Sequence, residues 1–534
     1  MTGTAGPDRA ASLRKDGGPP FGRVLVANRG EIALRIIRTC RELGMEAIAV
    51  YSDADADALH VRAADRAVRI GPAPAADSYL RGDVIVEAAL ASGAEAIHPG
   101  YGFLAERASF ARAVEHAGLV FVGPPSETIA SLGDKLAARR LARDAGLPIV
   151  PGTLEPAAVD GPDQVEAVLA EADGIGFPLL VKAAAGGGGR GMRRVERREG
   201  LPAALVAAAA EAASTFGDGT VYLEREVRPA RHVEVQLLGD AAGTIVVLGE
   251  RDCSIQRRRQ KLIEEAPAPG LTREERARLH EMALRIGRAA RLTNAATAEF
   301  LFDTERRFWF LEVNTRLQVE HGVTELLADL DLVAQQFAIA AGRALSPAAL
   351  NAATRAADPS RHAIEARISA EDPASDFAAA PGRVGRWAMP GGPGVRVDAG
   401  VEAGSRVPPD YDPLVAKLLV VAADRPAALA RLRRALEEVE VTGIQTTLPL
   451  HRFVADHPSF LAADISTDWV AQHWDGPTDR TKALAEAQLV AARIVAAGTP
   501  KGPPDAVKGP GRGSAASAAW RAASREAGLD RWPR

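Results

Sequence analysis

Cysteines, aromatic residues and long apolar runs are scarce in this chain. Its 534 residues include two cysteines, Cys40 and Cys253, and 5% aromatic residues. Two distant cysteines outside any Cys-x-x-Cys pair exclude a disulfide framework and a cysteine-ligated metal site, and they are typical of a reducing compartment. No apolar run reaches the ~18 residues that a membrane-spanning helix needs. We therefore expect a cytoplasmic protein with no membrane partner.

A charge excess of either sign is also missing. Lys plus Arg total 65 and Asp plus Glu total 69, so the net charge is −4. A nucleic-acid binder would show a strongly basic footprint, so we expect no nucleic-acid partner. Residues 1–20 lack the apolar core of a secretory signal and predict a disordered N-terminal tail. At about 150 residues per domain, the length predicts three or four domains.

Lysine is scarce although arginine is abundant. Only eight of the 65 basic residues are lysines, and between residues 21 and 475 only Lys135, Lys182, Lys261 and Lys417 occur. A compact ammonium can fit where the planar guanidinium of arginine cannot. We interpret these four lysines as candidate sites where arginine would fail; chance survival is the alternative.

Strand and helix patterns alternate near the N-terminus. Residues 22–28 and 47–51 are predicted buried strands, and apolar residues at helical spacing over 32–43 predict a helix between them. This alternation predicts a doubly wound parallel α/β domain over residues 21–133.

Changes of pattern divide the rest of the chain. A second α/β region is expected at 134–343, and an α+β region with short strands at 344–474. Residues 475–534 are rich in Ala, Gly and Pro, with helical patterns at 484–494 and 514–527. We interpret these as candidate partner-docking helices; a disordered tail is the alternative.

A run of glycines follows an apolar strand pattern at 178–181. Gly186–Gly189 are four consecutive glycines, preceded by Lys182. Backbone N–H groups without side chains can close over an anion. The segment is not a Walker A loop, because its lysine precedes the glycines. We predict a phosphate cradle rather than a flexible linker.

Polar residues recur at every second position from 312 to 320. An extended chain would place this series on one side, although a solvated face of a half-exposed strand would give the same pattern. The strand pattern at 298–302 and the turn at 303–307 would set Glu299 beside Glu312. With Asn314, they form a hard oxygen set suited to Mg²⁺ on ATP phosphates.

Five positive residues gather between Arg251 and Lys261. Such charge runs are usually solvated surface. The strand pattern at 245–248 before the run and the proline-rich stop after it favour a positioned loop.

The chain resembles the biotin carboxylase component of biotin-dependent acyl-CoA carboxylases, an ATP-grasp ligase, over about residues 21–470. The motifs that carry the resemblance are, in chain order, Ala27-Asn28-Arg29-Gly30-Glu31-Ile32-Ala33, His98-Pro99-Gly100-Tyr101-Gly102-Phe103-Leu104, the glycine run, Arg231-His232-Val233-Glu234, the 251–261 segment, the 312–320 series, Ile368-Ser369-Ala370-Glu371-Asp372-Pro373 and Tyr411-Asp412-Pro413. The resemblance implies a pre-ATP-grasp domain at 21–133, an ATP-grasp domain at 134–343 with a mobile lid at about 150–225, and a biotin carboxylase C-terminal domain at 344–474.

The resemblance also implies the reaction and its residues: ATP-dependent carboxylation of biotin by bicarbonate through carboxyphosphate, with Mg²⁺ or Mn²⁺. The implied ATP contacts are Lys135, Lys182, Gly188, Gly189, Glu224, Val227, His232, Gln256, Arg259, Leu301 and Ile444. The implied metal ligands are Glu299, Glu312 and Asn314. Bicarbonate would bind Lys261, Arg316, Gln318 and the backbone of Val319, with Glu320 as general base, and Arg367 would stabilise the biotin enolate.

Three departures from the family pattern stand out. Arg259 replaces a histidine, Gly322 replaces a proline, and 225–227 differs from the common Lys-Tyr-Leu. Because of Gly322, we keep a second hypothesis, in which the chain is a related ATP-grasp carboxylase component such as a urea-type enzyme. A catalytically silent assembly subunit is the third hypothesis, and competent residues at the metal, bicarbonate and base positions disfavour it.

The resemblance implies partners as well: a biotinylated carrier protein, a carboxyltransferase subunit, and a homodimer or larger hetero-oligomer. We expect the biotin to be carried on another polypeptide, because no lysine beyond residue 475 has the flanking methionine typical of a biotin attachment site. An acetyl- or propionyl-CoA type of acceptor is expected for the holoenzyme.

Overall fold

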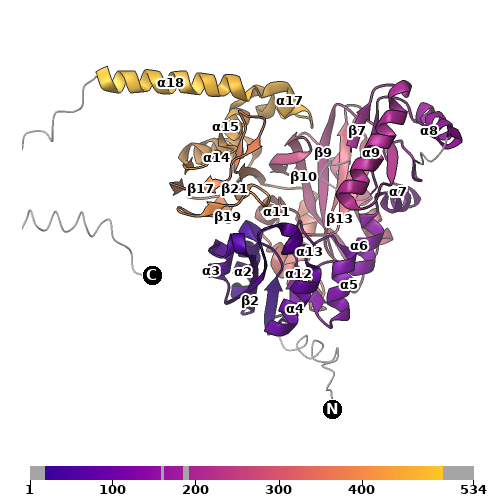
Figure 1. The fold of residues 1–534 in the computed structure, drawn as a ribbon, viewed down its shortest axis with the longest axis horizontal. Coiled ribbons are helices and arrows are strands. Elements are labelled where there is room, and N and C mark those ends of the chain that lie inside the picture. Colours follow the sequence, from indigo (N-terminus) through magenta and orange to yellow (C-terminus); the bar gives the residue numbers. More distant parts are fainter. Residues whose placement is uncertain (1–17, 158–161, 185–191, 497–534) are drawn as a thin grey trace, which may run out of the picture. The chain divides into compact units, whose positions relative to one another are not determined.

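The computed structural model describes residues 18–157, 162–184 and 192–496. Its contacts define two units, residues 1–476 and 477–534, which are described separately. The second unit contains most of helix α18 (Gly476–Ala496; Figure 1), which begins earlier than the helix expected at 484–494. The helix expected at 514–527 lies outside the described residues.

The N-terminal part is a five-stranded parallel sheet, as expected, with strand order β3-β2-β1-β4-β5. Its strands are β1 (Arg23–Val26), β2 (Glu46–Ser52), β3 (Arg66–Gly71), β4 (Ala96–His98) and β5 (Val120–Phe121). Its helices are α2 (Gly30–Glu42), α3 (Leu59–Ala63), α4 (Gly82–Ser92), α5 (Ala108–His116) and α6 (Ser126–Gly133). The order reverses beside β1, where open α/β sheets place their crevice. Asn28, just after β1, donates hydrogen bonds to the carbonyls of Pro99 (2.7 Å) and Tyr101 (2.8 Å) at this edge.

The largest sheet has eight antiparallel strands and crosses the boundary expected at residue 343. Its strands, in spatial order, are β13 (Phe308–Asn314), β12 (Asn294–Asp303), β9 (Ala230–Gly239), β10 (Ile245–Arg257), β11 (Gln260–Ala266), β14 (His362–Ser369), β21 (Leu414–Ala422) and β19 (Val395–Ala399). β11 and β14 pair with Ile263 opposite Ala366. The central and C-terminal segments therefore share one sheet, which fixes their site residues relative to one another.

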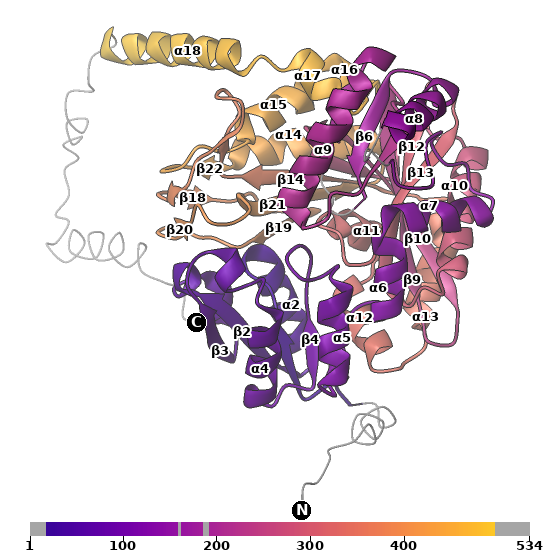
Figure 2. The ribbon, with the colours of Figure 1, turned by 45° about the vertical axis from the view of Figure 1, so that its right-hand side comes forward.

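A small three-stranded sheet lies within the region expected to form a lid. It has the order β7-β6-β8 and consists of β6 (Leu179–Ala183), β7 (Met192–Val195) and β8 (Val221–Arg225), with helices α8 (Pro162–Ile175) and α9 (Leu201–Phe216). Leu179, Val181 and Leu223 of the sheet pack with Leu201 and Leu205 of α9 in a hydrophobic cluster of their own. A segment with a core of its own can move as one body. Figure 2 shows α9 beside β6 in this segment.

The remaining elements cover the large sheet and extend its C-terminal side. The helices are α7 (Lys135–Asp144), α10 (Arg273–Ala289), α11 (His321–Ala328), α12 (Leu332–Ala340), α13 (Pro347–Ala356), α14 (Arg425–Glu438), α15 (Leu448–Asp456), α16 (Pro458–Leu461) and α17 (Trp469–His473). The short strands are β15 (Glu371–Asp372), β16 (Ala378–Ala379), β17 (Gly382–Arg383), β18 (Trp387–Ala388), β20 (Arg406–Val407) and β22 (Glu440–Val441). Thr272 caps α10: its hydroxyl accepts from the Glu275 N–H (3.2 Å), and the Glu275 carboxylate accepts in return (2.8 Å).

The prediction of a loop at 251–261 is wrong. These residues form the hairpin of β10 and β11, and Arg258 and Arg259 make the turn with positive φ angles of 49° and 68°. Arg251 is buried and donates to Glu234, Gln236, Thr297 and Thr324. Its charge is satisfied inside the protein, whereas Arg258 and Arg259 are exposed at the turn. The charge run is therefore buried at its start and solvated at the turn.

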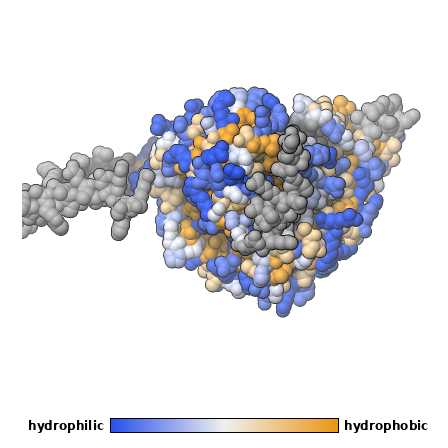
Figure 3. Space-filling view, turned by 90° about the horizontal axis from the view of Figure 1, so that it is seen from below, coloured by the Kyte–Doolittle hydropathy of each residue, from blue (hydrophilic) through white to orange (hydrophobic). Residues whose placement is uncertain are grey.

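The surface offers no membrane-spanning element among the described helices, none of which is long and apolar enough. On the face seen in Figure 3, hydrophilic and hydrophobic residues intermingle. The exposed large hydrophobic residues Leu90, Val206 and Leu350 come from three different helices, and Leu80 precedes α4. Apolar residues exposed singly are ordinary on protein surfaces.

Candidate active site

Three side chains expected in catalysis meet in a buried cluster. Lys261 Nζ, on β11, lies 2.6 Å from Glu320 Oε1, and Arg367 Nη2, on β14, lies 2.9 Å from Glu320 Oε2. Glu320 immediately precedes α11, and its side chain is 0% exposed. The carboxylate is thus held between two cations, one at each oxygen.

The charges of this cluster decide its protonation. Burial acts to raise the pKa of Glu320, but Lys261 and Arg367 outweigh burial and hold it well below its usual value. Burial raises the pKa of neighbouring Glu264, an ion-pair partner of Arg367, to about 7. An ionised Glu320 can accept a proton while the two cations stabilise an anion beside it.

The acidic pair expected from the sequence lies in register. Glu299 of β12 is directly opposite Glu312 of β13. Glu299 Oε1 accepts a hydrogen bond from Asn314 Nδ2 (2.8 Å), and its Oε2 lies 2.9 Å from His232 Nε2. Burial acts to raise the pKa of Glu299, but Lys261 and His232 hold it well below its usual value. Ionised carboxylate oxygens beside an amide oxygen fit the preferences of Mg²⁺.

The expectation of one extended strand from 312 to 320 is wrong, because β13 ends at Asn314. Hydrogen bonds still gather the side chains beyond that point. Arg316 Nη1 donates to Gln318 Oε1 (2.9 Å), and Gln318 Nε2 donates to Glu299 Oε1 (3.1 Å). The segment therefore turns at the site instead of running straight past it.

Glu106 is a residue that the sequence analysis missed. Its Oε2 accepts a hydrogen bond from Arg316 Nε at 2.8 Å. Glu106 lies two residues after the motif 98–104. Its closeness to that motif is the sequence feature that could have identified it. It orients Arg316 from the N-terminal part of the fold.

Two lysines among the implied ATP contacts also have carboxylate partners. Lys182 on β6 pairs with Glu224 on β8, and Lys135 Nζ lies 3.4 Å from Glu312 Oε2. Burial lowers the pKa of Lys182 although Glu224 acts to raise it. Arg139, a second residue missed from the sequence, donates to Glu224 Oε2 (2.7 Å). Glu224, one of the implied ATP contacts, here pairs with both Lys182 and Arg139.

The other expected nucleotide contacts are spread more widely. Leu301 lies opposite His232 across β12 and β9, and Gln256 is buried on β10. Arg259 lies at the exposed turn of the hairpin, and Ile444 packs at the edge of the C-terminal core. Gly188 and Gly189 lie outside the described residues.

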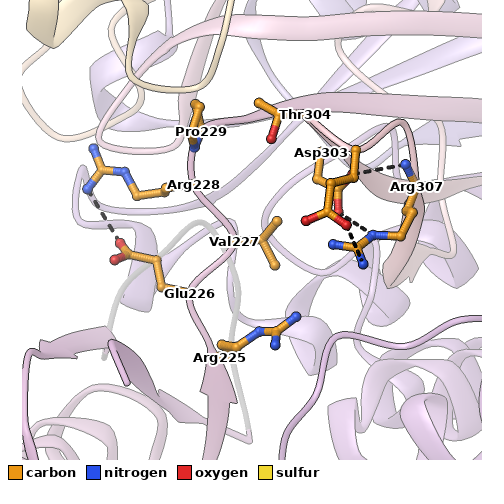
Figure 4. A pocket seen from close by; sticks show the side chains of 9 residues that line it. Arg225, Glu226, Val227, Arg228, Pro229, Asp303, Thr304 and Arg307 are labelled. Atoms are coloured by element: carbon orange, nitrogen blue, oxygen red, sulfur yellow. Dashed lines mark hydrogen bonds and ion pairs between the residues drawn. The ribbon is translucent and has the colours of Figure 1, made fainter. Parts of the chain in front are cut away.

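A cavity of about 340 Å³ lies beside the connection from β8 to β9. Val227 projects into the middle of it, opposite the turn between β12 and β13 (Figure 4). Asp303 and Arg307 form an ion pair on that turn, and Glu226 pairs with Arg228 on the other wall. The cavity is polar, and Val227 is the one expected nucleotide contact that lines it among the described residues.

A large antiparallel sheet that carries the acidic pair Glu299 and Glu312, together with a small sheet that carries Lys182, is the arrangement of the ATP-grasp class of ligases. Three family models match successive parts of the chain: the biotin carboxylase N-terminal domain (residues 20–129), the ATP-binding domain of the carbamoyl-phosphate synthase L chain (134–348) and the biotin carboxylase C-terminal domain (365–472). The chain belongs to the biotin carboxylase family.

Known proteins agree with this assignment along most of the chain. The chain is 45% identical over 453 residues to the biotin carboxylase of Nostoc sp., covering 85% of this chain and 99% of that one. It is 47% identical over 457 residues to a biotin-dependent acyl-coenzyme A carboxylase alpha3 subunit of Mycobacterium leprae, covering 85% and 75%. The structure matches, with TM-score 0.80 and 42% identity, the biotin carboxylase domain of Hydrogenobacter thermophilus 2-oxoglutarate carboxylase in complex with MgADP, ADP and bicarbonate, covering 85% and 98%.

Proposed function

We propose that this biotin carboxylase carboxylates biotin held on a separate carrier protein, using ATP and bicarbonate, as the subunit of an acyl-CoA carboxylase. The position of Glu320 carries the proposal: it is a buried, ionised base held between Lys261 and Arg367. The likeness to an acyl-coenzyme A carboxylase subunit supports the acceptor class. We extend the proposal to an acceptor of the acetyl- or propionyl-CoA type. The proposed partner is a carboxyltransferase subunit, and the chain would act in a homodimer or larger assembly.

Bicarbonate is a poor electrophile, so it must be activated and deprotonated in one place. In the proposed mechanism, Lys261, Arg316, Gln318 and the Val319 backbone bind bicarbonate, and Glu320 takes its proton as it attacks the γ-phosphate of ATP. A base is most useful when it is ionised at the working pH, which the cations around Glu320 ensure.

The nucleotide and metal contacts follow from the same arrangement. We assign the phosphates to Lys135 and Lys182 and to the glycines at 188 and 189, with the residues implied above around the base and ribose. Glu299, Glu312 and Asn314 would hold Mg²⁺, which supplies charge neutralisation at the transferred phosphoryl group. Closure of the small sheet and its helices would exclude water from carboxyphosphate.

Arg367 serves the second half of the reaction. Its guanidinium lies beside Glu320 at the end of the charge cluster, where it can stabilise negative charge that develops on the ureido oxygen as the biotin nitrogen takes the carboxyl group. A fixed cation in a site that excludes water stabilises such charge strongly.

The test is ADP release by the purified chain in the four combinations of bicarbonate and biotin, with a further arm in which urea replaces biotin. Strong release only when both are present supports the proposal. Release that needs bicarbonate and urea instead would favour a urea-type component, and no release under any combination would favour an assembly subunit. Addition of a biotinylated carrier protein should raise the rate further.

A further inference from the structure

Lys417 is the one scarce internal lysine to which the proposed function gives no role. It lies on β21, and its side chain is 0% exposed. Its Nζ donates a hydrogen bond to the carbonyl oxygen of Val319 at 2.8 Å, and it lies 3.3 Å from Glu31 Oε1 and 3.9 Å from Asp398 Oδ2. Val319 directly precedes the base Glu320.

The partners of Lys417 come from three parts of the fold. Glu31 is in the first turn of α2, Asp398 lies opposite Lys417 on β19, and Val319 is in the segment between β13 and α11. α2 packs against β19 and β21 (Figure 2). Lys417 therefore joins the N-terminal part and the edge of the large sheet to the catalytic segment.

The position of Glu31 in this junction is fixed by the backbone. A Cβ added at Gly400 would lie 2.6 Å from the Glu31 nitrogen and 2.8 Å from the carbonyl carbon of Gly30. Only glycine allows the strand end and the helix start to approach so closely. The Glu31 carboxyl group also accepts a hydrogen bond from Tyr101, so it presents a fixed acceptor to Lys417. Burial raises the pKa of Glu31, and the charge of Lys417 acts against that rise.

The charge on Lys417 is retained despite its burial. Burial acts to lower its pKa, but Glu31, Glu365 and Asp398 outweigh burial and raise it. A charged donor makes a stronger hydrogen bond to a carbonyl than a neutral one does. The carbonyl of Val319 thus accepts a hydrogen bond from a charged ammonium whose position is fixed by its other partners.

We propose that Lys417 is a positioning residue for the bicarbonate site. By holding the Val319 carbonyl it orients the peptide that carries Gln318 and Glu320, so that bicarbonate meets contacts already in place. This inference rests on the proposed function, and it assigns to Lys417 an effect on bicarbonate and not on ATP.

The test replaces the donor and neutralises its nearest carboxylate; buried Glu365 also loses the favourable charge of Lys417. In Lys417→Met/Glu31→Gln the aliphatic stem remains, Glu31 becomes neutral, and Asp398 keeps its ion pair with Arg396 at 2.7 Å. Losing a charged hydrogen bond predicts a fall in kcat/KM for bicarbonate of about tenfold to a hundredfold. The KM for ATP should stay within about twofold, because neither residue contacts Lys135 or Lys182.

Leu418→Ala is the matched control, since Leu418 is buried in the core on the opposite face of the same strand. It should lower Tm and leave the KM for bicarbonate unchanged. Unchanged bicarbonate kinetics in the folded double variant, or a bicarbonate effect equalled by Leu418→Ala, would overturn the inference.

A second variant covers the case in which the double variant does not fold. Glu31→Gln alone loosens the anchor, so the KM for bicarbonate should rise several-fold with the KM for ATP constant; no rise overturns the inference. Absence of bicarbonate-dependent turnover in the unaltered chain would instead overturn the proposed function, and this inference with it.

Discussion

The replacement Glu320→Gln tests the centre of the proposed mechanism. Glutamine keeps the shape of the side chain and removes the proton acceptor. A general base contributes about 10²- to 10⁴-fold to a rate, so kcat for bicarbonate-dependent ADP release should fall by that amount. The ionised state of Glu320 makes the loss independent of pH between 6 and 8, because its pKa is held well below its usual value.

The structure also predicts what this variant keeps. Lys261 retains Glu234 at 2.6 Å and Glu299 at 3.1 Å, and Arg367 retains Glu264, so neither cation is left alone. The fold and the binding of ATP should survive. The KM for bicarbonate should not rise, since the site gains net positive charge.

The assay is steady-state ADP release with bicarbonate and biotin, together with calorimetric titration of ATP. Glu265→Gln is the matched control: Glu265 is the neighbour of Glu264 on β11, is equally buried, and pairs with His362 and Arg425 away from the site. It should retain kcat. If Glu320→Gln keeps turnover within about tenfold of the unaltered chain, Glu320 is not the base.

Three further outcomes are expected. Glu312→Gln should raise the Mg²⁺ concentration for half-maximal activity about tenfold, since a charged ligand is lost; an unchanged Mg²⁺ titration would exclude Glu312 as a ligand. Lys182→Arg should lower activity more than about tenfold although charge is kept, because a planar fork replaces a point charge; near-normal kinetics would show that the lysine is incidental. His362 and Arg425, working against burial, hold the pKa of Glu265 at about 2 instead of 4.5, a difference worth about 3 kcal/mol at pH 7. Because that pKa is lowered on folding, the stability gap between Glu265→Gln and the unaltered chain should shrink as pH falls from 4.5 towards 2; urea denaturation at several pH values measures this, and a constant gap would contradict it.

The pairing of Glu299 with Glu312 could be predicted because both strands and their turn are local in the sequence. The detail of β13 could not. Phe300 lies opposite Phe310, whereas Glu299 lies opposite Glu312, so an extra residue, Leu311, bulges between them. Under strict alternation Glu312 and Phe310 would lie on the same face of the strand. The bulge places Glu312 on the other face.

Contacts between distant segments could not be predicted from the sequence. Glu106 meets Arg316 from 210 positions away, and Arg139 meets Glu224 across 85. The fold brings these side chains together through packing of whole sheets and helices, and no local pattern records it. The predicted loop at 251–261 failed for the same reason: Arg251 lies on a buried strand, where it donates to Glu234 on the neighbouring strand.

The scarce lysines show both the strength and the limit of composition as a signal. Lys135, Lys182, Lys261 and Lys417 each lie within 4 Å of a carboxylate. Carboxylate pairing alone does not demand lysine, because Arg251 is equally buried and serves four partners at once with its fork. Lys417 has three acceptors near its Nζ, the Val319 carbonyl at 2.8 Å and the carboxylates of Glu31 and Asp398 at 3.3 and 3.9 Å. The three donors of an ammonium match this number, whereas the five donors of a guanidinium would leave some unsatisfied. The choice of lysine at this position therefore reflects the number and direction of its partners. Because lysine is scarce in this chain, such positions could be noticed from the sequence.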